Sequence, residues 1–179
     1  MRFALVVPAL ALLLGGCAGY KLGPSKPYFM QQTETIAVPS FKNNTLLPRM
    51  EVLAANCVIH EFQVDGTYKI VSENQADAVL EGTVVNVDRR PARSLRGNVL
   101  RTTEFEMNLT VSYNVMQRTT GKVLTQGTAI GTTSFFVTGD LQQDERQAFP
   151  LAMEKAAVQI VSQISEGWQK SESASQQTR

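Results

Sequence analysis

The sequence predicts an α+β domain, a two-layer sandwich in which two helices pack on one face of a mixed four-stranded sheet. Residues 104–115 alternate without exception between apolar and polar side chains, which indicates a strand with one core face and one polar face. Two other segments, residues 50–62 and 149–168, each have one apolar stripe at helical spacing. Because each element has a single apolar face, two layers are sufficient to bury them all. The predicted element order is β-α-β-β-β-α, with a right-handed crossover through the first helix.

The first half of the domain begins with a strand and a helix. Residues 35–41 predict the strand, with Pro39 near its end, where proline is tolerated. Residues 42–48 predict a loop. The helix that follows ends at Gly66, a common C-terminal cap, and its apolar stripe consists of Met50, Leu53, Ala54, Cys57, Val58 and Phe62.

The second half adds three strands and a final helix. Residues 68–71 and 78–87 supply strand material, followed by the alternating strand at 104–115. A turn at Thr120-Gly121-Lys122 connects that strand to residues 123–137 and gives a hairpin. The final helix has its stripe on Phe149, Met153, Ala156, Ile160, Ile164 and Trp168.

The N-terminus has the pattern of a lipoprotein signal peptide. Arg2 precedes an apolar run at 3–14, which is shorter than the roughly 20 residues needed to cross a bilayer. Two glycines then stand before Cys17, the small-small-cysteine pattern that a bacterial lipoprotein peptidase cleaves. We therefore expect a signal peptide at 1–16 and lipidation of Cys17, with two or more acyl chains anchoring the protein to a membrane.

The remaining boundaries follow from composition. Residues 17–33 contain glycine and proline with few aliphatic side chains, and predict a tether between the lipid and the domain. The folded domain is expected at 34–168, and the polar residues 169–179 predict a disordered tail. Cleavage of the signal peptide removes Arg2, and the mature chain then has equal numbers of basic and acidic residues. Its net charge therefore cannot attract nucleic acid, and any anion site must be local.

Residues typical of enzymes and metal sites are scarce. His60 is the only histidine and has no ligand-type partner at metal-binding spacing, so no metal or other cofactor is expected. It also lacks a nucleophile motif, and we expect it at a solvent-facing or edge position. Glu104 and Glu106 could line a site, but a solvated sheet face is the favoured interpretation. Cys57 is expected to be a buried hydrophobe, and the chain is not expected to be an enzyme.

One cluster of basic residues stands out between the second and third core strands. Five arginines lie there with Asp88 as the only acid among them. Arginine binds phosphate and carboxylate groups well because its planar fork donates two hydrogen bonds at once. The alternative is a solvated hairpin tip whose arginines only aid solubility. The candidate anion-binding residues are Arg89, Arg90, Arg93, Arg96 and Arg101.

A second set of residues suggests a partner interface. Phe135 and Phe136 are adjacent, so in a strand they must point to opposite faces. Leu46 and Leu47 are also adjacent apolar residues, and they precede Pro48 in the first predicted loop. Exposed apolar residues can mark an interface, although they can also cover the open ends of a sandwich. The candidate interface residues are Leu46, Leu47, Phe135, Phe136 and Leu141.

Six short stretches, in order along nearly the whole mature chain, resemble the lipopolysaccharide-assembly lipoprotein (LptE) family of Gram-negative outer membranes. They are residues 17–23, 35–45, 61–66, 76–82, 120–124 and 166–168.

The resemblance implies a two-layer sandwich without enzymatic activity. It implies that the protein is anchored at the periplasmic face of the outer membrane, and Ala18 after the cysteine agrees with that sorting. Its implied partners are lipopolysaccharide and a large LptD-like β-barrel, which it would plug and help to assemble. The arginines at 89–101 would then contact the anionic glycolipid.

An alternative resemblance is to curli-pore proteins and TolB-like N-terminal domains, which open with a similar strand and helix. That alternative implies a structural lipoprotein, either a homo-oligomer or a peptidoglycan-associated scaffold.

Overall fold

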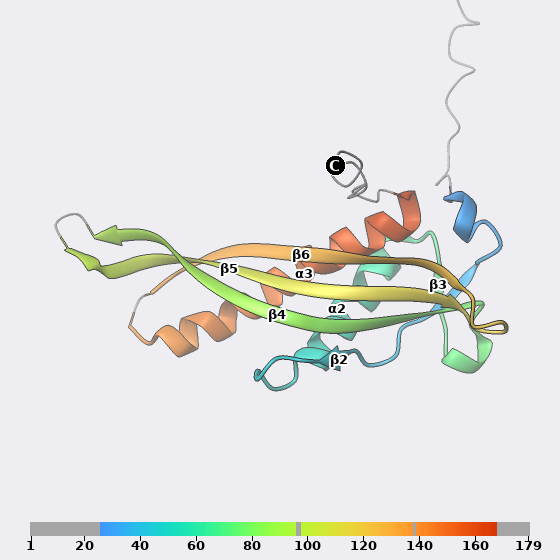
Figure 1. Ribbon diagram of the computed structural model, residues 1–179, viewed down its shortest axis with the longest axis horizontal. Coiled ribbons are helices and arrows are strands. Elements are labelled where there is room, and N and C mark those ends of the chain that lie inside the picture. Colours follow the sequence, from blue (N-terminus) through green and yellow to red (C-terminus); the bar gives the residue numbers. More distant parts are fainter. Residues whose placement is uncertain (1–25, 96–97, 138, 168–179) are drawn as a thin grey trace, which may run out of the picture.

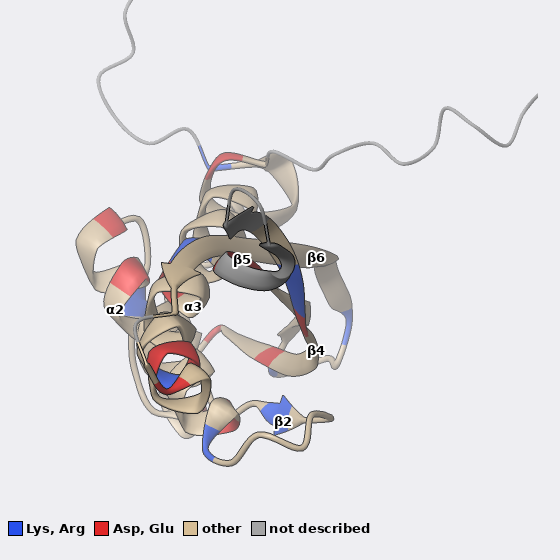
Figure 2. Ribbon diagram, turned by 90° about the vertical axis from the view of Figure 1, so that its left-hand side faces the viewer, with Lys and Arg blue, Asp and Glu red and all other residues tan. Residues whose placement is uncertain are grey.

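Two helices lie side by side on one face of a long, twisted sheet in the computed structural model (Figure 1), and a view along the sheet shows the two layers (Figure 2). The structure describes residues 26–95, 98–137 and 139–167. Its elements are η2 (Tyr28–Met30), β1 (Thr35–Ala37), β2 (Lys42–Asn43), α2 (Met50–Asp65), β3 (Lys69–Ile70), η3 (Glu73–Gln75), β4 (Ala78–Leu95), β5 (Asn98–Gln117), β6 (Val123–Phe136) and α3 (Leu141–Glu166).

The predicted class and the single helical layer are confirmed, but the expectation of four strands is wrong because the sheet formed by the described residues has six. Its order is β3-β1-β4-β5-β6, and β2 pairs with a further stretch of β4. The predicted strand at 35–41 is a strand only at 35–37, and it ends before Pro39, which has no N–H to donate to a ladder. β1 pairs in parallel with Ala78 and Val79, whereas β2 pairs with Thr83 and Val84. Part of the predicted loop at 42–48 is therefore a strand.

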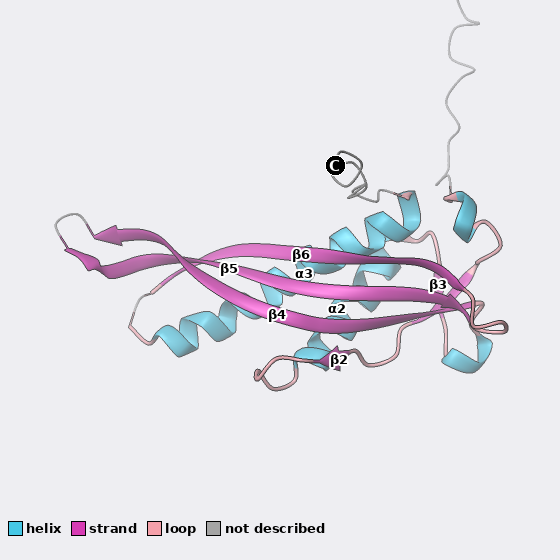
Figure 3. Cartoon of the chain, viewed as in Figure 1, coloured by secondary structure: helices cyan, strands magenta, loops and turns pink. Residues whose placement is uncertain are grey.

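The segment that contains the five arginines also differs from expectation. It was expected between two strands, but it belongs to a β-ribbon formed by those strands. β4 and β5 continue past the predicted boundaries and pair antiparallel out to Leu95 and Asn98. Pro91 is accommodated because the register shifts between Pro91 and Arg93, an irregularity of the kind where proline occurs in sheets. Figure 3 shows this ribbon extending beyond both helices and twisting strongly, as two-stranded ribbons do.

The core lies between the helices and the sheet. The alternating strand is confirmed, because its apolar side chains from Met107 to Val115 are buried beneath the helices. The stripe of α3 is buried at Met153, Ala156, Ile160 and Ile164, and Trp168 lies outside the described residues. Small residues let α3 approach β6 closely, because a Cβ at Gly131 would overlap the carbonyl oxygen of Ala152.

Two buried tyrosines connect α3 to the rest of the core. The Tyr113 hydroxyl donates to Gln163 Oε1 at 2.7 Å, and the Tyr68 hydroxyl donates to the Ile164 carbonyl at 3.4 Å. Burial raises the pKa of Tyr113 to about 12. Burial, with a smaller contribution from the charge of Asp65, raises the pKa of Tyr68 to about 12. Both hydroxyls therefore stay protonated and able to donate at neutral pH.

The folded part begins earlier than the predicted residue 34. Met30 is fully buried in the core, and the Lys26 ammonium donates to the Thr33 carbonyl at 2.7 Å while lying over the Tyr68 ring. Pro27 lies beside Gly167, so residue 26 and the end of α3 meet at one end of the molecule, away from the ribbon (Figure 1). None of the described helices combines the length and apolarity that a membrane crossing requires.

Candidate functional site

The candidate anion site lies on the arginine ribbon, which we define as residues 88–95 of β4 with residues 98–106 of β5. Arg89, Arg90 and Arg93 belong to β4, and Arg101 belongs to β5. Arg96 and the side chains of Arg93 and Arg101 lie outside the described part of the structure. The two arginines with described side chains, Arg89 and Arg90, are consecutive and point to opposite faces of the ribbon.

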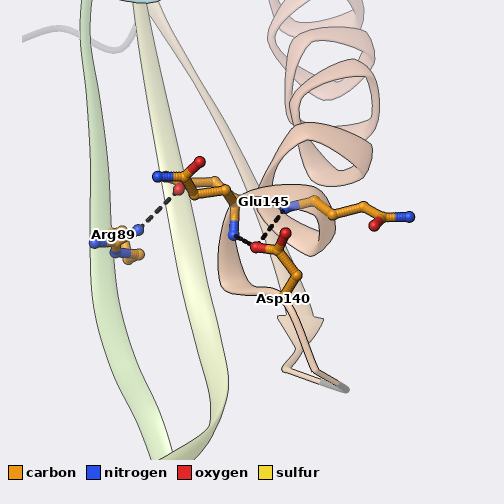
Figure 4. Close-up of polar contacts among 5 residues, drawn as sticks. Arg89, Asp140 and Glu145 are labelled. Atoms are coloured by element: carbon orange, nitrogen blue, oxygen red, sulfur yellow. Dashed lines mark hydrogen bonds and ion pairs between the residues drawn. The ribbon is translucent and has the colours of Figure 1, made fainter.

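Arg89 points to the helical side and is held there. Its Nη1 donates to Glu145 Oε2 on α3 at 2.8 Å, as the close-up shows (Figure 4). Its guanidinium also lies 5.6 Å from the centre of the Phe105 ring, which in turn stacks on Phe135 at 5.8 Å. These contacts connect the base of the ribbon to α3, so Arg89 is a positioning residue for the ribbon.

An N-cap residue fixes the start of α3, close to the contact between Arg89 and Glu145. Asp140 is the N-cap, and its Oδ1 accepts hydrogen bonds from the backbone N–H groups of Gln142 and Gln143 at 2.9 and 3.4 Å (Figure 4). Such a cap satisfies donors that the first turn of a helix otherwise leaves unpaired. The capped turn leads directly to Glu145, and the N-cap therefore helps to place the carboxylate that holds Arg89.

Arg90, the next residue along the strand, points to the opposite, outer face. No described helix covers that face of the sheet (Figure 2). Its side chain is 71% exposed, and its ion pair with Asp88 is long, at 3.7 Å. Exposed pairs of this kind contribute little energy, so the guanidinium can exchange Asp88 for another anion. Glu106 lies opposite Arg90 in the register and accepts a hydrogen bond from Asn108 at 3.1 Å. The surroundings of Arg90 thus include Glu106, an acidic residue of β5 that is distant from Arg90 in the sequence.

The structure divides the five candidate interface residues into two kinds. Phe135 is 8% exposed and Phe136 is 60% exposed, which confirms that they point to opposite faces. Leu47 and Leu141 pack against the core, so they cover its edge. Leu46 is fully exposed. Of these five residues, Leu46 and Phe136 therefore remain as exposed apolar surface for a partner.

Within the described part of the chain, the histidine and the cysteine do not belong to a cluster of reactive side chains. His60 is exposed on α2, as expected. Cys57 is half-buried against the core, less enclosed than expected, and burial with the nearby charge of Glu154 raises the pKa of its thiol. Among the described residues, no group of three or more His, Cys, Asp or Glu side chains is placed to share a metal ion.

Two clefts at the end away from the ribbon were not predicted from the sequence. One has a volume of about 470 Å³ and is lined by Phe29, Val123, Leu124, Thr125 and Gln126. The other, of about 410 Å³, shares Phe29 and Leu124 and adds the polar side chains of Asp77, Arg118 and Lys122. Phe29 lies in the segment that was expected to be a tether, residues 17–33, and no cleft was therefore expected beside it. The neighbouring apolar residues Phe29 and Met30 were the available signal.

Comparison with known proteins gives one family and a recurring fold. The family model described as lipopolysaccharide-assembly, LptE, matches residues 33–164. A PelC dodecamer from Paraburkholderia phytofirmans is 16% identical, with a TM-score of 0.51 over 79% of this chain and 93% of that one. The hypothetical protein CT253 from Chlamydia trachomatis is 8% identical, with a TM-score of 0.52 over 74% and 96%. These likenesses show a shared fold. No curated protein sequence matches the chain.

Proposed function

Because the chain belongs to the LptE lipopolysaccharide-assembly family, we propose that it is a lipid-anchored subunit of the lipopolysaccharide export machinery. In this role it docks into a large outer-membrane β-barrel, assists the assembly of that barrel and contacts lipopolysaccharide, without making or breaking bonds. The family match over residues 33–164 carries the proposal, because it covers almost the whole described sandwich.

The arrangement of the two ends of the molecule supports this role. Residue 26, the first described residue after the expected lipid anchor at Cys17, lies at one end, and the arginine ribbon lies at the other (Figure 1). β4 has 18 residues and, at about 3.3 Å per residue, reaches over roughly 55 Å. A bilayer with its headgroups is about 40–45 Å thick. A domain anchored at the inner leaflet and aligned with the barrel axis therefore places its ribbon at the level of the outer leaflet.

The outer face of the ribbon suits the proposed ligand. Lipopolysaccharide has phosphate and acidic sugar groups, and arginine forms charge-assisted hydrogen bonds to both. We assign this contact on the outer face to Arg90. Arg93, Arg96 and Arg101 remain candidates from the sequence, because their side chains lie outside the described part of the structure. Arg89 is excluded from the set because Glu145 already holds its guanidinium.

The role in the machinery is tested by purifying the tagged full-length chain from detergent-solubilised outer membranes. We expect an outer-membrane β-barrel protein to co-purify in a near-stoichiometric amount. A ring-shaped homo-oligomer without a barrel, seen by electron microscopy, would instead support the alternative of a structural scaffold.

The ligand contact is tested by reversing one exposed charge. We expect Arg90→Glu to weaken binding to purified lipopolysaccharide by about tenfold, because it replaces a charge-assisted hydrogen bond by repulsion. Its melting temperature should stay near that of the original protein, since Arg90 is exposed and makes one long ion pair. The matched control is Lys69→Glu, which makes the same charge change on the exposed Lys69 in β3. Equal affinity of the two variants, measured by fluorescence titration, would refute the assignment.

A further inference from the structure

β6 forms one edge of the sheet and lacks the usual protection of an edge strand. Its 14 residues, VLTQGTAIGTTSFF, include no charged side chain and no proline. Edge strands present unpaired N–H and C=O groups, and soluble proteins usually guard them with lysine, other charges or proline. β6 is also rich in β-branched and aromatic residues, which favour strand pairing. This strand is therefore well suited to accept a further strand.

Among the described residues, side chains of α3 protect the middle of this edge. The Ile130 N–H donates to Gln159 Oε1 at 2.7 Å, and Lys155 Nζ donates to the Thr132 carbonyl at 2.7 Å. These contacts show that the backbone groups of Ile130 and Thr132 point away from β5. In an antiparallel ladder this orientation repeats every second residue. The pairing with β5 is regular from Thr125 to Phe136, so Gln126 and Thr128 also present their N–H and C=O groups to the free edge.

A cleft lies beside this unprotected stretch. The 470 Å³ cleft runs along residues 123–126, and Phe29 of η2 forms its apolar wall. Val123 is 46% exposed beside it. No hydrogen bond among the described residues outside the β5–β6 ladder uses the backbone of Gln126 or Thr128. The site therefore offers backbone hydrogen bonds next to an apolar wall, which is what an extended segment with alternating side chains requires.

We propose that the free edge of β6 at Gln126 and Thr128 binds an extended segment of the barrel partner, which adds to the sheet as a further strand. The identity of the partner rests on the proposed function. The occupant is recognised by its backbone, with an apolar side chain directed at Phe29 and Val123.

Two other occupants fit less well. A second copy pairing β6 with β6 around residue 127 would place residue 124 opposite Ile130, whose N–H is already bonded to Gln159. The chain's own segments at 18–25 and 169–179 contain only one β-branched residue, Thr178, and so lack the composition of strands.

The test removes one outward N–H. Gln126→Pro deletes a donor that β5 does not use, and proline is tolerated on an edge strand with its nitrogen facing outward. The matched control, Gln126→Ala, changes the side chain and keeps the N–H. Each full-length variant is purified from outer membranes, and the recovered barrel is quantified. We expect Gln126→Pro to recover about tenfold less barrel protein than Gln126→Ala.

A second measurement leaves the strand intact in case proline disturbs the fold. A photo-crosslinking residue at Thr128, introduced in cells, should capture the barrel protein, and mass spectrometry should map the capture to one extended segment. Equal barrel recovery by Gln126→Pro and Gln126→Ala overturns the proposal while leaving the proposed function intact. Crosslinks at Thr128 only within the chain or to a second copy also overturn it. Failure of the unchanged protein to recover any barrel overturns the proposed function as well.

Discussion

Replacing Gly131 with alanine is expected to lower the free energy of unfolding by about 3 kcal/mol. The added Cβ would overlap the carbonyl oxygen of Ala152 and lie 2.8 Å from the amide nitrogen of Ala156. Both atoms belong to the backbone of α3, so no change of rotamer can relieve the clash. The helix must move away from β6, and the buried contacts of Ile160 and Ile164 loosen with it. Urea denaturation followed by circular dichroism measures the loss.

Gly139 provides the matched control for this substitution. A Cβ at Gly139 meets no atom within 4 Å, so Gly139→Ala should leave stability nearly unchanged. Gly82→Ala is a useful intermediate case, because its Cβ would meet the ring of Phe41, a side chain that can shift. Equal stability of Gly131→Ala and Gly139→Ala would show that α3 does not pack against β6 as closely as described here.

Replacing Cys17 with serine is expected to abolish acylation of the protein completely. A serine hydroxyl cannot form the thioether that holds the lipid, and no other residue can replace that sulfur. Each buried methylene of an acyl chain contributes about 0.8 kcal/mol, so the loss of two or more chains removes the membrane anchor. Cells grown with an alkyne-tagged fatty acid report this directly, because the labelled protein is visible on a gel after a click reaction.

The second cysteine gives the control for the anchor. Cys57 is half-buried against the core in α2, so Cys57→Ser should retain the full acyl label. Label on the Cys17→Ser variant would refute the proposed anchor, and so would an unmodified N-terminus in mass spectrometry of the original protein.

Periodic segments were the part of the fold that the sequence predicted well. The alternation at 104–115 and the stripes of the two helices identified the faces that the structure buries. The strand count was wrong partly because β2 has two residues, which is too short for any periodicity to show. β3 lies within the strand material expected at 68–71, but it is separate from β4 and pairs with β1. The ribbon was missed because Arg89, Arg90 and Pro91 are not typical strand residues. They are held in β4 by pairing with β5.

The candidate site was predicted as a list of residues without their orientations. Five arginines with one local acid suggested a single basic cluster. In the structure, the side chains of Arg89 and Arg90 point to opposite faces, because side chains alternate along a strand. It also pairs Arg89 with Glu145, 56 residues later in the chain. Such pairing is set by helix packing, which no local pattern contains. The free edge of β6 was invisible for the same reason, since an edge exists only in relation to the other strands.

By itself, the sequence determined which segments are helices or long strands, which of their faces are apolar, where a lipid is expected and which family the chain resembles. These properties depend on neighbours a few residues apart, or on short motifs read along the chain. Tertiary structure alone decided which arginine is held and which is available, how closely α3 approaches Gly131 and which strand is left with an open edge. Those outcomes depend on contacts between residues far apart in sequence, and only the packed sheet and helices bring them together.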